Sequence, residues 1–129
     1  MMPSDFIGKI VNGKFKYYNS KTNQMDVKAR PFFIIKCESN TFPCDFNGFP
    51  LSSINHSNNI DVMFDVKIET KKYPLLKLRR DISYIRVHKM QTLHSEEINR
   101  KPISSIVDNY GELYLEIIEK FDLFCASCF

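Results

Sequence analysis

Hydrophobic and polar residues alternate with a period of two in several stretches before residue 95. The alternation is clearest in Ile60–Thr70, where the apolar positions are Val62, Phe64, Val66 and Ile68. Successive side chains of a strand point to opposite faces, so this spacing is typical of a strand with one buried face. We therefore predict a half-buried strand over Ile60–Thr70.

Further segments with apolar, β-branched or aromatic residues predict more strands: Phe6–Val11, Phe15–Tyr18, Pro31–Ile35, Phe49–Ile54 and Asp81–Met90. Pro31–Ile35 is apolar throughout, which suits a strand that is buried on both faces. Asn12-Gly13 is a strong hairpin signal and predicts a turn between the first two of these strands. Polar residues predict loops over Asn19–Lys28, Asn40–Gly48 and Asn55–Asn59, and Tyr73–Leu78 is expected to be a connector.

The C-terminal part of the chain changes to a helical period. Apolar residues recur at steps of three and four positions: Tyr110, Leu113, Tyr114, Ile117, Ile118 and Phe121. Asn109 is expected to be the N-cap, with Glu112 completing a capping box. A second, short helix is expected at Ser95–Ile98, with Ser95 as its N-cap.

Strands followed by one long helix indicate an α+β fold. We predict a small, strongly curved or barrel-like antiparallel sheet, with the helix covering one opening or face. With 129 residues the chain has the length of one domain, 1–129.

Composition narrows the classes of partner only slightly. The formal net charge is +3, which permits a polyanionic partner without requiring one. No charge-free run approaches the roughly 18 apolar residues of a membrane helix, and the start of the chain lacks the pattern of a signal peptide. We therefore expect a cytoplasmic protein with no membrane partner.

The four cysteines are Cys37, Cys44, Cys125 and Cys128. A zinc site would need two closely spaced pairs that converge, and the spacing of Cys37 and Cys44 is too long for one. The C-x-x-C at the end of the chain lacks the strand and helix context of a redox motif. We expect free thiols and no metal or cofactor.

Six polar residues are candidates for chemistry: Arg30, Ser52, Ser53, Arg86, His88 and His94, the last of which is expected in a loop with a surface role. Strand parity places Arg86 and His88 on the same face, as neighbours in space. Each residue also has an ordinary structural interpretation, such as an arginine at the surface end of a strand or a buried, hydrogen-bonded serine. No phosphate-binding glycine loop or known hydrolase motif accompanies them.

Several short motifs occur together in a particular order. They are Lys28-Ala-Arg30-Pro31 with its apolar strand, Pro50-Leu-Ser52-Ser53, Asp65-Val-Lys-Ile-Glu69, Leu78–Ser83, Ile85–His94 and the C-terminal helix. In this order and spacing the chain resembles the MazF/PemK family of toxin endoribonucleases from toxin–antitoxin systems. The resemblance covers Lys28–Phe121.

The resemblance implies an SH3-like barrel and a homodimer whose interface grooves bind single-stranded RNA. It implies cleavage without a metal, and a cognate antitoxin whose acidic tail covers the groove. Arg30 falls on the family's catalytic arginine and Ser52 on its catalytic hydroxyl. Arg86 and His88 fall where related members carry Arg and Asp in the site. We expect His88 to be catalytic with Arg30 and Ser52, and Lys28, Ser53 and Arg86 to bind RNA.

The same residues suit RNA cleavage on chemical grounds. The 2′-hydroxyl of RNA can attack the adjacent phosphorus if the developing charge is stabilised and protons are moved. Arginine stays protonated, so Arg30 and Arg86 suit charge stabilisation. Histidine titrates near neutrality, which makes His88 the acid–base candidate. We expect Ser52 to hydrogen-bond the phosphate or the 2′-hydroxyl.

Two other functions are compatible with the sequence. The first is a non-catalytic module on the same barrel that binds RNA or protein, and it is motivated by the departure at His88. The second is a gyrase poison, which is disfavoured because the C-terminal tail Phe121–Phe129 is apolar and has the character of a packed or interfacial end.

Overall fold

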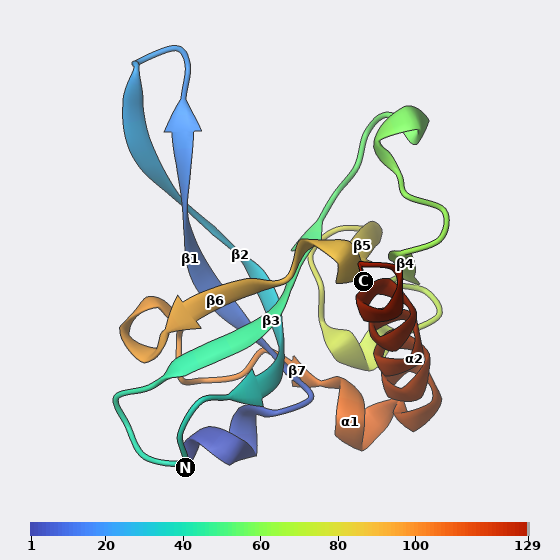
Figure 1. Ribbon diagram of the computed structural model, residues 1–129. Coiled ribbons are helices and arrows are strands. Elements are labelled where there is room, and N and C mark those ends of the chain that lie inside the picture. Colours follow the sequence, from blue (N-terminus) through green and yellow to red (C-terminus); the bar gives the residue numbers. More distant parts are fainter. Residues whose placement is uncertain (129) are drawn as a thin grey trace.

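A computed structural model describes residues 1–128 as a curved antiparallel sheet with a C-terminal helix packed against one face (Figure 1). The order of the main path is β4-β5-β3-β2-β1-β7, and β6 pairs with β3 beside this path. The strands are β1 (Lys9–Asn19), β2 (Gln24–Cys37), β3 (Asp45–Ser52), β4 (Asp65–Glu69), β5 (Ile82–Arg86), β6 (Gln91–His94) and β7 (Ser104–Ser105).

The helices are short except for the last one. They are the single-turn 3₁₀ helices η1 (Pro3–Phe6), η2 (Ser57–Asn59), η3 (Pro74–Leu76), η4 (Val87–Lys89) and η5 (Ser95–Glu97), and the α-helices α1 (Ile106–Asn109) and α2 (Gly111–Ser127). All helices of residues 1–128 lack the length or the hydrophobicity that a membrane-spanning helix requires.

Strands β1 and β2 form one long hairpin that extends away from the body of the molecule (Figure 1). The predicted turn at Asn12-Gly13 is wrong, because β1 continues through it and the chain reverses between Asn19 and Gln24. Gly13 serves close packing instead, since a Cβ there would meet Leu93 Cδ1 at 2.6 Å. Asn23, with φ of 53°, provides the left-handed residue of the actual turn.

The predicted loop Asn19–Lys28 is wrong for its second half, which belongs to β2. Gln24–Lys28 of β2 pair with Phe15–Asn19 of β1, and these two segments form the outer arm of the hairpin. Both faces of this outer arm are largely exposed to solvent, so its sequence carries little hydrophobic alternation. The prediction for Pro31–Ile35 is confirmed, and Phe32, Phe33 and Ile34 are fully buried.

The sheet separates two hydrophobic cores. Phe33 points into the core beneath α2, together with Phe49, Ile85 and Ile117. The neighbouring side chains of β2 point the other way, into the core that contains Phe6, Phe32, Ile34, Phe46 and Leu93. The continuous apolar run of β2 therefore has the physical cause that the sequence suggested, burial on both faces.

Strand β3 has three partners. It pairs with β2 along its length, with β6 at its first half and with β5 at its end. The predicted turn over Asn40–Gly48 is therefore wrong beyond Cys44, because Asn47-Gly48 lies inside this strand. The predicted strand Phe49–Ile54 is correct as far as Ser52.

The two strands at the other end of the sheet are shorter than predicted. Of Ile60–Thr70 only Asp65–Glu69 is a strand, and Val62 is 91% exposed. Val66 and Ile68 face the core as expected, but Asp65 is also buried. The predicted strand Asp81–Met90 ends at Arg86, where the chain enters η4.

The predicted C-terminal helix is confirmed as α2. Leu113 and Ile117 are buried, and Tyr114 and Phe121 pack against the same core. The predicted N-cap is wrong, because Tyr110 holds that position and Asn109 ends α1. The short helix η5 is also present, but its cap is His94, whose ring accepts a hydrogen bond from the Glu96 N–H at 3.1 Å.

The architecture agrees with the predicted α+β class. The sheet curves into a half-barrel, and α2 covers the core on one of its faces (Figure 1).

Candidate functional site

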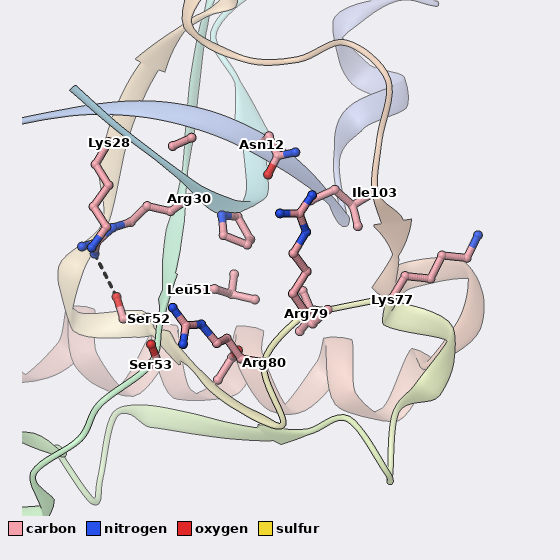
Figure 2. A pocket seen from close by; sticks show the side chains of 14 residues that line it. Asn12, Lys28, Arg30, Leu51, Ser52, Ser53, Lys77, Arg79, Arg80 and Ile103 are labelled. Carbon is pink, nitrogen blue, oxygen red and sulfur yellow. Dashed lines mark hydrogen bonds between the residues drawn. The ribbon is translucent and has the colours of Figure 1, made fainter.

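Two residues that the sequence singled out meet between β2 and β3. Phe32 of β2 pairs with Pro50 of the antiparallel strand β3. Arg30 comes two residues before Phe32 and Ser52 two residues after Pro50, so the side chains of Arg30 and Ser52 share one face of the sheet. The Arg30 Nη1 atom donates a hydrogen bond to Ser52 Oγ at 3.0 Å (Figure 2). Because a guanidinium group is a donor only, Ser52 Oγ accepts this bond, and its own O–H is left to donate to another group.

This pair lies on the wall of a hollow of about 670 Å³. The hollow is formed by β1, the middle of β2, the end of β3, the segment between η3 and β5, the start of β5 and the residue before β7. Its lining residues are Asn12, Lys28, Ala29, Arg30, Pro31, Leu51, Ser52, Ser53, Lys77, Leu78, Arg79, Arg80, Ser83 and Ile103.

The hollow is strongly basic. Lys28, Arg30, Lys77, Arg79 and Arg80 line it, and no Asp or Glu does so within the described chain. None of these five side chains lies within 4.0 Å of a carboxylate in residues 1–128. A concave site lined by one sign of charge concentrates its field, so the hollow favours an anionic ligand.

Between the cations the lining is apolar. The side chains of Pro31, Leu51, Leu78 and Ile103 contribute to the hollow, and Leu51 is nearly fully buried. A ligand that combines an apolar surface with negative charge would match both parts of this lining.

Local conformation brings three of the cations to the hollow. Leu76 of η3 is fully buried, and Lys77 has a φ of 56°, which reverses the direction of the chain. Leu78 then packs against the core beneath α2, while Arg79 and Arg80 are exposed. The Thr70 hydroxyl donates to the Arg80 carbonyl at 2.5 Å and so ties this segment to the end of β4.

No role was predicted for these cations, because Tyr73–Leu78 was expected to be a connector and Leu78–Ser83 was only one of the ordered motifs of the resemblance. A signal was present: Lys77-Leu-Arg79-Arg80 places three cations in four residues. What the sequence lacks is any sign that these cations face Arg30 across a hollow.

Lys28 and Ser53, two of the residues expected to bind RNA, also line the hollow. Lys28 lies on the outer arm two residues before Arg30, and Ser53 follows β3 directly. Figure 2 shows Lys28 beside Arg30, and Ser53 beside Arg80. Four of the six residues expected to act in catalysis or RNA binding therefore lie together, namely Lys28, Arg30, Ser52 and Ser53.

Arg86 has a different environment. Its Nε donates to Asp65 Oδ1 at 3.0 Å and its Nη2 to Asp65 Oδ2 at 3.3 Å, which makes a two-pronged ion pair. Nη2 also donates to the Asn59 carbonyl at 3.1 Å. The Asp65 side chain is fully buried and that of Arg86 is 22% exposed. The charge of Arg86 is thus neutralised by Asp65.

His88 belongs to the cluster around Asp65. Its Nε2 lies 3.4 Å from Arg86 Nη2, so the predicted proximity of these two residues is confirmed. Its Nδ1 lies 3.8 Å from Asp65 Oδ1 and has no hydrogen-bond partner among the described residues. The ring packs near Phe64 and Phe124. Burial lowers the pKa of His88, although Asp65 opposes this effect.

Arg86 and His88 therefore form a cluster apart from the Arg30–Ser52 pair, and neither of them lines the hollow. The physical reason is local: β5 ends at Arg86, and η4 turns His88 toward the C-terminal end of α2. The candidate residues therefore divide between the hollow and the cluster around Asp65.

The cysteines are free thiols. Cys44 is buried, and burial raises the pKa of its thiol. Within residues 1–128, no group of three or more His, Cys, Asp or Glu side chains is arranged to hold a metal ion.

No protein-family model matches the chain, and no curated protein matches it. The function proposed for the chain therefore depends on the geometry of the hollow and on the chemistry of its lining residues.

Proposed function

We propose that this protein is a MazF/PemK-like toxin endoribonuclease that cleaves single-stranded RNA without a metal ion. The observation that carries the proposal is the hydrogen-bonded Arg30–Ser52 pair on the wall of a hollow that five cations and, within residues 1–128, no carboxylate line. RNA supplies both the negative charge and the apolar base surfaces that match this lining.

In the proposed reaction the substrate provides the nucleophile. The 2′-oxygen forms a bond to the adjacent phosphorus, and the bond from phosphorus to the 5′-oxygen of the next nucleotide breaks. The products are a 2′,3′-cyclic phosphate and a free 5′-hydroxyl. Use of the 2′-hydroxyl restricts cleavage to RNA.

Arg30 and Ser52 stabilise the charge that develops on the phosphorus oxygens. The guanidinium of Arg30 has further N–H donors beside the one bound to Ser52. Ser52, which accepts from Arg30, directs its own O–H to a non-bridging oxygen. Donors held in position before the reaction stabilise a transition state without the cost of reorganisation.

Proton transfer in this proposal involves water. Among the described residues, no imidazole and no carboxylate lines the hollow. The His88 ring lies in the cluster around Asp65 instead. Water therefore accepts the proton of the 2′-hydroxyl and supplies one to the leaving 5′-oxygen, while the cations stabilise the phosphorane.

The biological setting of the proposal comes from the resemblance to the family. We propose a cytoplasmic homodimer with an SH3-like barrel, inhibited by an antitoxin with an acidic segment. The five cations of the hollow provide the complementary charge for such a segment.

The proposal is tested with pure protein, mixed single-stranded RNA and excess chelator. We expect fragments that end in 2′,3′-cyclic phosphate, and no cleavage of the same sequences as DNA. Cleavage of DNA, or fragments formed only when a divalent metal is added, would contradict it.

A second candidate is a module that binds RNA or protein without cleaving it. The observation that favours this module is the lack of an imidazole or carboxylate in the lining of the hollow, within the part of the chain that the structure describes. The same experiment separates the two, because the module binds RNA and leaves it intact.

A further inference from the structure

We propose that the hollow holds one guanine base of the bound RNA and that Arg79 recognises it. The inference rests on the proposed RNA ligand and adds a base specificity to it. It is carried by the position and free donors of Arg79, the apolar lining between the cations and the amide of Asn12.

The two sides of the hollow have different properties. On one side, Arg30 is held by Ser52 with Lys28 beside it, at the place proposed for the phosphate. On the other side, Figure 2 shows the Arg79 side chain extending across the hollow toward Asn12. Arg79 is exposed and forms no ion pair within residues 1–128. Its donors are thus available to a ligand.

The region between these sides suits a flat ring. Pro31, Leu51, Leu78 and Ile103 supply apolar surface to the hollow. The volume of about 670 Å³ lies within the roughly 300–1,000 Å³ of small-molecule sites. A base placed here has its ring against apolar side chains and its polar edge toward Arg79 and Asn12.

The donors of Arg79 select among the bases. Guanine presents two neighbouring acceptors, O6 and N7, which match the two parallel N–H groups of a guanidinium. Adenine presents N7 beside the N6 amino group, a donor that would oppose the donors of Arg79. The carbonyl oxygen of Asn12 can accept from N1–H of the same guanine. Guanine, unlike adenine, satisfies both side chains in this arrangement.

The preference is measured without cleavage. The probes are short 2′-O-methyl oligouridines that carry one guanine, one adenine or one 7-deazaguanine at the same position, and binding is followed by fluorescence anisotropy. Methylation blocks the attacking hydroxyl, so the probes stay intact. We expect guanine to be bound about 5- to 150-fold more tightly than adenine, and 7-deazaguanine to lose most of this advantage because it lacks N7.

The variant Arg79→Lys keeps the charge and removes the paired donors. We expect its preference for the guanine probe over the adenine probe to shrink but not to vanish, because the Asn12 carbonyl still accepts from N1–H of guanine. Arg100→Lys is the matched control, because Arg100 lies over the Phe42 ring, outside the hollow, and the guanine preference should persist. The 7-deazaguanine probe tests the same contact in the unaltered protein.

Equal affinity of the unaltered protein for the three probes would overturn the inference, as would an undiminished guanine preference in Arg79→Lys. The outcome is separable from that of the proposed function. Guanine preference with no cleavage of unmethylated RNA retains this inference and removes the enzyme. Cleavage with no base preference retains the proposed enzyme and removes this inference.

Discussion

Arg30 differs from two other arginines of the chain in the nature of its partner. Arg86 is neutralised by the buried carboxylate of Asp65. Arg100 forms an ion pair with Glu96, in which Arg100 Nη2 lies 3.8 Å from Glu96 Oε1. Arg30 instead donates to the neutral hydroxyl of Ser52. Its orientation is fixed while its positive charge stays available, which is the combination that an anionic transition state requires.

We therefore expect Arg30→Ala to reduce RNA cleavage by about 10²–10³-fold, the typical cost of removing one such donor. The measurement is the initial rate on a single-stranded RNA under single-turnover conditions. Arg100→Ala provides the control for loss of an arginine away from the hollow. Cleavage at the unaltered rate by folded Arg30→Ala protein would remove Arg30 from the site.

His88 gives the stability of the protein a dependence on pH. Because burial lowers its pKa in the folded state, the unfolded chain binds the proton more readily. Stability is therefore highest above the ordinary histidine pKa of about 6.5 and decreases as the pH falls below it. The pKa of the Asp61 carboxyl is also lowered. Burial acts against this change, but hydrogen bonds from the Phe64 and Met63 N–H groups outweigh it. Asp61 titrates at more acidic pH.

We expect the unfolding midpoint to decrease between pH 7.5 and pH 5.5, and His88→Gln to show a smaller decrease over this range. Thermal unfolding followed by circular dichroism measures both. His94→Gln is a control at a histidine whose ring caps η5 outside the Asp65 cluster. A steeper loss of stability in His88→Gln than in the unaltered protein would contradict this role.

At the scale of the elements, β3 connects the parts of the sheet that build the hollow. Its end pairs with β5, and the face that it shares with β2 carries the Arg30–Ser52 pair. The approach of β2 and β3 depends on Gly48, since a Cβ there would meet Phe33 O at 2.1 Å and Phe32 Cζ at 2.9 Å. The first of these atoms belongs to the backbone of the neighbouring strand and cannot move aside cheaply.

We expect Gly48→Ala to lower the free energy of unfolding by about 1–3 kcal/mol, the usual cost of overpacking. Denaturant unfolding of the two proteins measures it. Gly111→Ala is the matched control, because no atom lies within 4 Å of a Cβ at Gly111, the first residue of α2. Alanine favours a helix more than glycine, so this variant should be as stable as the unaltered protein or more so. A neutral effect at Gly48 would show that the two strands can separate without cost.

The elements also show which sequence signals were reliable. The helical period of α2 and the apolar run in β2 predicted both elements, because each buries a face that the period records. The two Asn-Gly pairs were misleading, because Gly13 and Gly48 serve close packing inside strands. The outer arm of β1 and β2 escaped prediction since it buries little on either face.

At the scale of the whole molecule, the distribution of charge matters more than its sum. The formal net charge is only +3, yet five cations surround one hollow that no carboxylate lines within residues 1–128. A polyanion bound there would displace the counterions of the phosphates that it contacts. Affinity should therefore fall steeply as salt is added.

We expect a plot of log affinity for single-stranded RNA against log salt concentration to have a slope of about −3.5 if all five cations contact phosphates, and less if fewer do. Lys28→Ala should make this slope less negative by about 0.7. Lys71→Ala removes an equal charge outside the hollow and should leave the slope nearly unchanged. An equal change in both variants would indicate a general effect of net charge.

The sequence by itself determined which segments form the central strand and the long helix, and which of their faces are buried. This information is local, because a period of two or 3.6 residues records the environment of one element. The face of α2 and the burial of Pro31–Ile35 could be predicted for this reason. The proximity of Arg86 and His88 was predicted from strand parity and is confirmed, although His88 lies in η4 and not in the strand.

Only the tertiary structure decided which polar residues share a site. Arg30 and Ser52 meet because β2 and β3 pair in one register, and Arg79 joins them through a left-handed turn at Lys77. The strand ends at Arg86, before His88, and the His88 ring packs near Phe64 and Phe124 of α2 in another cluster. Such neighbours depend on contacts between residues far apart in the chain, and no local period records those contacts.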